Sequence, residues 1–253
     1  MVPSRQPSKR GRDESAATSP ETTSRQARRL NSPRGDGTSP VADDAQVATF
    51  EGRDGLKKEW HNRRNFVAQF INCSRPRADF ECGTELRADF LRCPDAHAES
   101  MQCSSAETNY KRCARPRAIH TDTEVAESNF LTCSDLQADF DNAKTARSNV
   151  KSCTGARLDF VDAESATATV EESSDVRTSF DCGRSGTARA DVKGCKGARI
   201  DFIDARSVTA TIEQCPEARV ELNNCERARA RFVNSRHELV DVLDCPGAVV
   251  AFE

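Results

Sequence analysis

A large apolar side chain recurs every ten residues from position 70 to position 252, with one interruption by two inserted residues. Most of these phase-zero positions hold Phe or an aliphatic residue, and the two polar exceptions are Ser100 and His120. A small or aliphatic residue stands two positions earlier, and a small residue, often Cys, stands three positions later. Repetition at a fixed period indicates a repeat architecture, in which each unit buries its apolar face against the next unit.

Within each ten-residue unit, here called a decad, the small and large apolar residues follow one another at steps of 3, 2, 2 and 3. Steps of two, as in Ala156, Leu158 and Phe160, place side chains on one face of a β-strand. Steps of three predict a corner, and Gly and Pro are frequent there. A continuous helix fits poorly, because Gly or Pro would interrupt it and the Thr-Ala-Thr-Val of residues 167–170 favours a strand. The pattern therefore predicts an all-β solenoid.

Alternate decads differ at the small corner position. One column of these positions starts at Cys73 and holds Cys at seven of nine places, whereas the other starts at Gly83 and holds Cys at three of nine. This difference predicts a structural repeat of 20 residues, with two decads in each coil. Residues 71–253 would then form about nine coils, which at a strand spacing of roughly 4.8 Å extend over roughly 43 Å.

Residues 1–53 lack the repeat and are predicted to form a disordered tail. Residues 1–40 contain seven Ser, four Thr and five Pro but almost no large apolar residue, so they cannot offset the entropy lost on ordering. Basic residues around Lys9 fit a nuclear signal or a solvated tail. In residues 54–70, Leu56 and Trp60 stand four apart, which predicts a short helix that caps the first coil.

Charge and hydropathy narrow the range of partners. Charged residues make up 30% of the chain and the net charge is −3, which argues against non-specific nucleic-acid binding and against strongly acidic mimicry of nucleic acid. There is no run of about 18 apolar residues, so we expect no membrane-spanning segment. The N-terminus lacks the apolar stretch of a cleaved signal peptide, so we expect a cytoplasmic protein or one exported by a signal-peptide-independent route.

Segments such as Ala78-Asp79-Phe80 combine a small, a polar and a large apolar residue. This unit resembles that of pentapeptide-repeat proteins over roughly residues 68–252, although only alternate pentads fit it. The resemblance implies a right-handed β-solenoid with the coil length inferred above and, in that family, four faces. A two-faced coil is the alternative, because the remaining pentads lack the central apolar residue. The resemblance also implies a second alternative, a DNA mimic that binds topoisomerases, as some members of the family do.

The 12 Cys residues include no C-x-x-C pair, so a zinc site of common spacing is not expected. Their interchange with Ala, Ser and Gly predicts small buried corner residues, and only Cys82 and Cys182, each two residues after a Phe, are expected to be more exposed. Ser100 and His120 lie one predicted coil apart, so their side chains could meet, which leaves a hydrolase as an alternative. We expect neither a metal nor a cofactor.

Regular repeats without a catalytic constellation predict a non-enzymatic protein-interaction scaffold. The alternative of a secreted bacterial effector treats residues 1–40 as a disordered leader that resembles a type III export signal. Arg184 and Arg189 are candidate protein-binding residues, because the insertion predicts a protruding loop. Val249, Ala251 and Phe252 are candidates because the last strand would be apolar on both faces and would pair with another chain, as a homodimer or with a partner protein.

Overall fold

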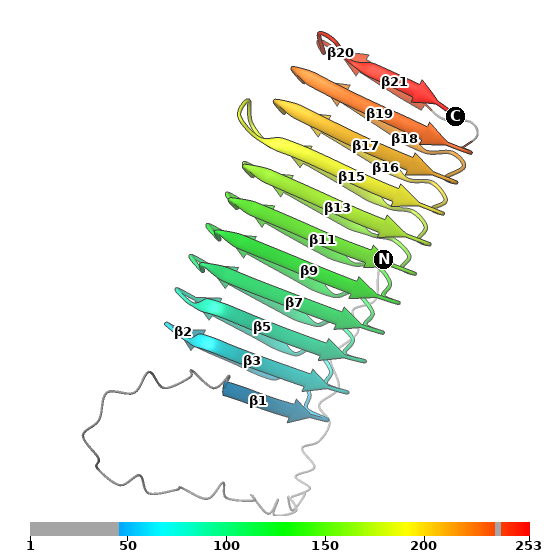
Figure 1. Ribbon diagram of the computed structural model, residues 1–253. Helices are drawn as coiled ribbons and strands as arrows, with labels where there is room; N and C mark the ends of the chain where they lie inside the picture. Colours follow the sequence, from blue (N-terminus) through cyan, green and yellow to red (C-terminus); the bar gives the residue numbers. More distant parts are fainter. Residues whose placement is uncertain (1–45, 236–238) are drawn as a thin grey trace, which may run out of the picture. The chain divides into compact units, whose positions relative to one another are not determined.

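The computed structural model describes residues 46–235 and 239–253, which form a parallel β-solenoid (Figure 1). The odd-numbered strands form an 11-stranded sheet, here called sheet I, and the even-numbered strands form a 10-stranded sheet, sheet II. The strands of sheet I are β1 (Gln46–Glu51), β3 (Arg64–Ile71), β5 (Thr84–Leu91), β7 (Ser105–Lys111), β9 (Val125–Leu131), β11 (Thr145–Lys151), β13 (Ser165–Glu171), β15 (Thr187–Lys193), β17 (Ser207–Glu213), β19 (Arg227–Val233) and β21 (Val249–Phe252). The strands of sheet II are β2 (Lys57–His61), β4 (Arg77–Glu81), β6 (His97–Met101), β8 (Arg117–Thr121), β10 (Gln137–Asp141), β12 (Arg157–Val161), β14 (Arg177–Asp181), β16 (Arg199–Ile203), β18 (Arg219–Asn223) and β20 (Leu239–Leu243). Within the described ranges, no helix has the length and apolar character needed to cross a bilayer.

The predicted coil of two decads is confirmed by the pairing of the strands. Neighbouring strands of a sheet run parallel with residues 20 positions apart in register, as Phe140 and Phe160 are. Pairs that span the insertion are 22 positions apart, as Phe180 and Phe202 are. Each coil contributes one strand to each of two hydrogen-bonded sheets.

The capping helix predicted over residues 54–70 is wrong, because this segment contains β2 and most of β3. Trp60 is in register with Phe80, and their ring centroids lie 5.1 Å apart. The helical interpretation failed because the inward residue that follows the corner also lies four residues before the phase-zero residue of a decad, as Leu136 lies before Phe140. The spacing of Leu56 and Trp60 therefore fits a strand as well as a helix.

The solenoid also begins earlier than predicted. β1 lies within the range assigned to the tail, and Phe50 stacks on Phe70 with ring centroids 5.2 Å apart. This additional coil raises the number within the described residues from about nine to about ten. The rest of the predicted tail, residues 1–45, lies outside the described residues, together with the candidate export leader and nuclear signal.

The core is a set of columns in which like side chains stack from coil to coil. The ring centroids of Phe140 and Phe160, and those of Phe160 and Phe180, lie 4.8 Å apart, with the ring planes within 2° and 6° of parallel. The spacing matches the separation of hydrogen-bonded strands, which therefore sets the ring distance. Complete burial of each Phe stabilises the fold by roughly 1.5–3 kcal/mol, and ring contacts add to this.

The corners depend on residues in the left-handed conformation. The second residue after the phase-zero position has a positive φ in most decads, for example 52° at Asn72, 52° at Asn142 and 51° at Asp162. Asn and Asp adopt this conformation at lower cost than branched residues do, which explains why they recur at these positions. The reversal at this residue turns the chain and directs the next small side chain into the core.

The insertion modifies one corner, between β14 and β15. Here Cys182 points into the core and is only 4% exposed, so the prediction that it is more exposed is wrong, whereas Cys82 is exposed as predicted. The extra residues follow Cys182 and return to the core at Gly186. A Cβ atom on Gly186 would lie 2.3 Å from the carbonyl oxygen of Cys182 and 2.5 Å from that of Ala163. Only glycine fits there without a movement of the backbone.

We therefore expect Gly186→Ala to lower the free energy of unfolding by about 1–3 kcal/mol, the usual cost of overpacking, as measured by urea denaturation. The matched control is Gly83→Ala, where the added Cβ would mainly meet a side chain instead of backbone oxygens, at 2.3 Å from Leu86 Cδ1. The control should lose less stability. Equal losses in the two variants would contradict a corner that is closed by backbone oxygens.

Candidate functional site

The last coil of the chain exposes a concentration of large apolar side chains on β20 and β21. We call these residues the terminal apolar surface: Leu239, Val242, Leu243, Val249 and Phe252. The other exposed large apolar residues of the described chain are spread over four other strands, with no more than two on any one of them. Phe252 shows why the last coil differs, because it is 61% exposed whereas Phe232, one coil earlier in the same column, is 1% exposed. Phe252 stacks on Phe232 at 5.2 Å on one side only.

Both strands of this coil are edge strands, since β21 ends sheet I and β20 ends sheet II. The outer side of an edge strand carries backbone groups without a strand partner. Of the predicted residues, Val249 and Phe252 are exposed and Ala251 is half-buried. Sequence analysis missed the β20 part of the surface. The available sequence indication was Leu239 itself, which stands where the preceding coil of sheet II has Arg219.

The other two predicted protein-binding residues lie in different surroundings. Arg184 is exposed in the inserted loop, which extends beyond the neighbouring corners just before β15 (Figure 1). Arg189 is exposed on β15, where its Nε atom donates to Asp191 Oδ2 at 2.6 Å. The loop is therefore as predicted, but Arg189 belongs to the outer face of sheet I rather than to the loop.

Ser100 and His120 do meet, inside the core. His120 Nδ1 lies 2.6 Å from Ser100 Oγ, and His120 Nε2 lies 2.9 Å from Ser128 Oγ. Ser128 Oγ is 2.8 Å from Thr108 Oγ1, which donates to the backbone oxygen of Glu127 at 3.4 Å. The network joins sheet II to sheet I through the middle of the coil.

This network satisfies a neutral imidazole. If Thr108 donates to the carbonyl, Ser128 donates to Thr108 and accepts from His120 Nε2–H, while Ser100 donates to Nδ1. Burial lowers the pKa of His120 to about 3, because the charged ring loses its solvation in the core. Ser100 is 1% exposed and His120 is 0% exposed, so this pair does not present a nucleophile to a dissolved substrate.

The Cys column has a structural role at the corners. The backbone N–H of Cys133 donates to Cys153 Sγ at 3.2 Å, and the N–H of Cys153 donates to Ser173 Oγ at 3.1 Å. Cys153 Sγ donates in turn to the backbone oxygen of Lys151 at 3.2 Å. A thiol or a hydroxyl thus forms hydrogen bonds with backbone groups at the corners, which explains why Ser can replace Cys in this column. Burial raises the pKa of the Cys93 thiol to about 11, which keeps it protonated.

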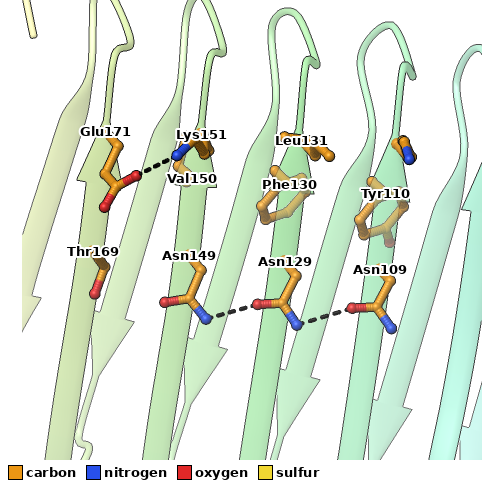
Figure 2. A pocket seen from close by; sticks show the side chains of 11 residues that line it. Asn109, Tyr110, Asn129, Phe130, Leu131, Asn149, Val150, Lys151, Thr169 and Glu171 are labelled. Carbon is orange, nitrogen blue, oxygen red and sulfur yellow. Dashed lines mark hydrogen bonds and ion pairs between the residues drawn. The ribbon is translucent and has the colours of Figure 1, made fainter.

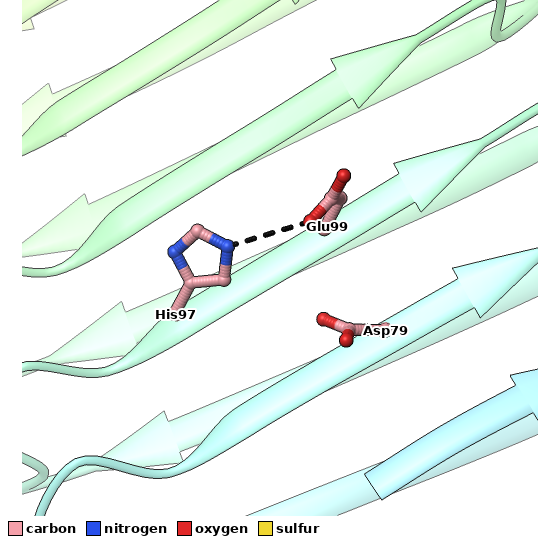
Figure 3. A group of neighbouring side chains, drawn as sticks. All are labelled: Asp79, His97 and Glu99. Carbon is pink, nitrogen blue, oxygen red and sulfur yellow. Dashed lines mark ion pairs between the residues drawn. The ribbon is translucent and has the colours of Figure 1, made fainter. Parts of the chain in front are cut away.

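One group of side chains on β4 and β6 resembles a set of metal ligands (Figure 3). The donor atoms of Asp79, His97 and Glu99 lie within 4.8 Å of one another. However, Arg77 Nε donates to Asp79 Oδ1 at 2.8 Å and Arg77 Nη2 donates to Glu99 Oε2 at 2.7 Å. The guanidinium of Arg77 thus neutralises both carboxylates in the place of a metal ion. Burial, with the charge of Arg77, lowers the pKa of His97, so we interpret this group as an ion-pair network.

A shallow groove of about 460 Å³ lies on the outer face of sheet I, beside a ladder of amides on β7, β9 and β11 (Figure 2). Asn129 Nδ2 donates to Asn109 Oδ1 at 2.9 Å, and Asn149 Nδ2 donates to Asn129 Oδ1 at 2.7 Å. Lys151 and Glu171 form an ion pair of 2.8 Å on the other side of the groove. Because these polar groups bind one another, the groove offers few free donors or acceptors to a ligand.

Comparison of the chain with protein families, with curated proteins and with solved structures gives no match. The likeness to pentapeptide-repeat proteins thus consists of the short motif and of a repeat β-solenoid with coils about 20 residues apart. The fold places the chain in the class of parallel β-solenoid repeat proteins.

The buried histidine predicts a loss of stability in acid. The fold lowers the His120 pKa from 6.5 to about 3, so it favours the neutral ring. The resulting stability is complete above pH 6.5 and is lost as the pH falls from there toward 3. From pH 7 to pH 5 we expect a loss of about 2 kcal/mol attributable to His120.

The measurement is urea denaturation at both pH values for the wild type and for His120→Phe. The variant extends the aromatic column, in which the ring centroids of His120 and Phe140 lie 5.1 Å apart. It also leaves the hydroxyls of Ser100 and Ser128 without their histidine partner, which lowers stability at every pH. The informative quantity is therefore the difference between the two pH values. The variant should lose about 2 kcal/mol less than the wild type, and an equal pH dependence would refute this role of His120.

Proposed function

We propose that this protein is a non-enzymatic interaction scaffold whose last coil binds a second copy of the chain end to end. The observation that carries the proposal is the gathering of exposed apolar side chains on a single coil, β20 and β21. Exposed apolar side chains gathered in one part of a protein are typical of protein-binding sites. The burial of the Ser100–His120 pair supports a role without hydrolysis.

A second copy fits this surface because it offers the same two features. An isologous interface joins one patch to an identical patch, so the apolar side chains of one copy contact those of the other, and the edge strands of the two copies lie side by side. Two of the carboxylates on this coil do not oppose the contact. Asp241 pairs with Arg219 at 2.8 Å, and Glu253 pairs with Arg231, so each carboxylate is already neutralised within its own chain.

The outer face of sheet II supports a protein partner over a topoisomerase-binding DNA mimic. Arg157 Nε donates to Asp159 Oδ2 of the same strand at 2.6 Å, and Arg117 Nη2 donates to Asp139 Oδ2 in the next coil at 3.2 Å. Ion pairs of this type alternate along the sheet and leave no continuous negative surface. From the sequence we propose a cytoplasmic location, or export without a signal peptide if residues 1–40 act as a leader.

The double variant Leu239→Lys, Leu243→Glu tests the scaffold proposal by sedimentation velocity at micromolar concentrations. Both side chains are exposed, at 61% and 58%, and the net charge is unchanged. We expect a dimeric wild type and a folded, monomeric variant, because the charges prevent burial of β20 in an interface.

The matched control is Val161→Lys, Met101→Glu, which replaces two exposed apolar residues in the middle of the same sheet. It should remain dimeric. A wild type that stays monomeric across the concentration series would sink the proposal, as would a control that dissociates as readily as the β20 variant.

A further inference from the structure

Strand β19 departs from the charge pattern of the other strands. Its sequence RARARFV alternates between exposed and buried residues, so Arg227, Arg229 and Arg231 all lie on the outer face of sheet I. Elsewhere an outward arginine is commonly followed two residues later by a carboxylate that binds it, as Arg189 is by Asp191 at 2.6 Å. On β19 the corresponding positions hold further arginines.

Within the described part of the chain, one of these three arginines has an ion-pair partner. Arg231 Nε donates to Glu253 Oε1 on β21 at 3.0 Å. Among residues 46–235 and 239–253, no carboxylate pairs with the guanidinium of Arg227 or of Arg229. Since side chains two residues apart on a strand lie roughly 6.6 Å apart, the two cations repel each other at the cost of some stability.

The neighbouring strand adds hydroxyl groups to the two cations. In register, Ser207 of β17 lies beside Arg227, and Thr209 lies beside Arg229. A cavity of about 360 Å³ opens between these residues, and Gly247 and Val249 border it on the side of the last coil. Among the described residues no Asp or Glu lines this cavity, and its polar lining there consists of two guanidinium groups, two hydroxyls and backbone.

We propose that this cavity binds a phosphate monoester. A guanidinium group presents paired N–H donors that match the oxygens of a phosphate, and two of them balance its two negative charges. The hydroxyls of Ser207 and Thr209 can donate to further oxygens of the group. The anion would replace the missing carboxylate of β19 and remove the repulsion between Arg227 and Arg229.

The extent of the site favours a single monoester over a nucleic-acid backbone. A polyanion requires a track of several cations along its length. Here the column through Arg229 continues to Thr209 and then to Arg189, whose charge is bound by Asp191. On the other side the column ends at Val249. The ligand we infer is a phosphorylated serine or threonine of a protein partner, or a small phosphate ester.

Fluorescence anisotropy with the full chain tests the proposal. The probe is a fluorescein-labelled peptide with one phosphoserine between glycines, and the comparison arms are the unphosphorylated peptide, inorganic phosphate as competitor, and a labelled single-stranded oligonucleotide. We expect the wild type to bind the phosphopeptide and to bind the unphosphorylated peptide at least 10-fold more weakly. The double variant Arg227→Gln, Arg229→Gln should bind the phosphopeptide at least 10-fold more weakly than the wild type does, because it loses charge-assisted contacts.

The control variant is Arg147→Gln, Arg177→Gln, which removes the same charge from exposed strand positions outside the cavity. It should bind the phosphopeptide as the wild type does. The cavity variant should also melt at the same or a higher temperature than the wild type, because it loses a repulsion, so weaker binding would not reflect unfolding.

Displacement of the phosphopeptide by inorganic phosphate supports the site. If the protein binds inorganic phosphate but does not bind the phosphopeptide, the site is also supported, and the ligand is assigned to a small ester. A wild-type dissociation constant weaker than about 1 mM for both overturns the proposal. Unchanged binding in the cavity variant, or binding of the oligonucleotide alone, overturns it as well.

Discussion

The parallel pairing of strands at one fixed spacing is the constraint on which the rest of the structure depends. Because residues one coil apart are in register, each side chain lies beside its counterparts at the strand separation of about 4.8 Å. Phe140 and Phe160 stack at 4.8 Å, and the amides of Asn109 and Asn129 bind each other at 2.9 Å. A residue type is favoured in a column when it can contact a copy of itself, as phenyl rings and amides do.

Interruptions of the columns are where the molecule acquires distinct chemistry. Where the repetition holds, polar groups find partners within the chain, as Asp79 and Glu99 do with Arg77. Where it fails, a group depends on partners of another kind. His120 is accommodated in an aromatic column only because hydroxyls reach it from both sheets. Phe252 has one stacking neighbour instead of two, and so the last coil keeps apolar surface exposed.

Much of the fold could be predicted because the alternation of a strand is a local property. The spacing of Ala156, Leu158 and Phe160 correctly identified them as core residues. Two predictions failed where local spacing is ambiguous. The four-residue interval of Leu56 and Trp60 fits a helix and a decad equally well. The inward direction of Cys182 depends on the path of the backbone through an irregular corner, which no periodic pattern describes.

The sequence by itself determined the coil length, the inward columns, the insertion and the apolar character of β21, because each follows from spacing along a single chain segment. Only the tertiary structure decided which groups meet between coils. The sequence predicted that Ser100 and His120 could meet, but it did not predict that Ser128 would bind the other ring nitrogen, Nε2. Likewise, Arg229 lies beside Thr209 through the register of two strands. Such neighbours are set by strand pairing across coils, and this pairing exists only in the folded chain.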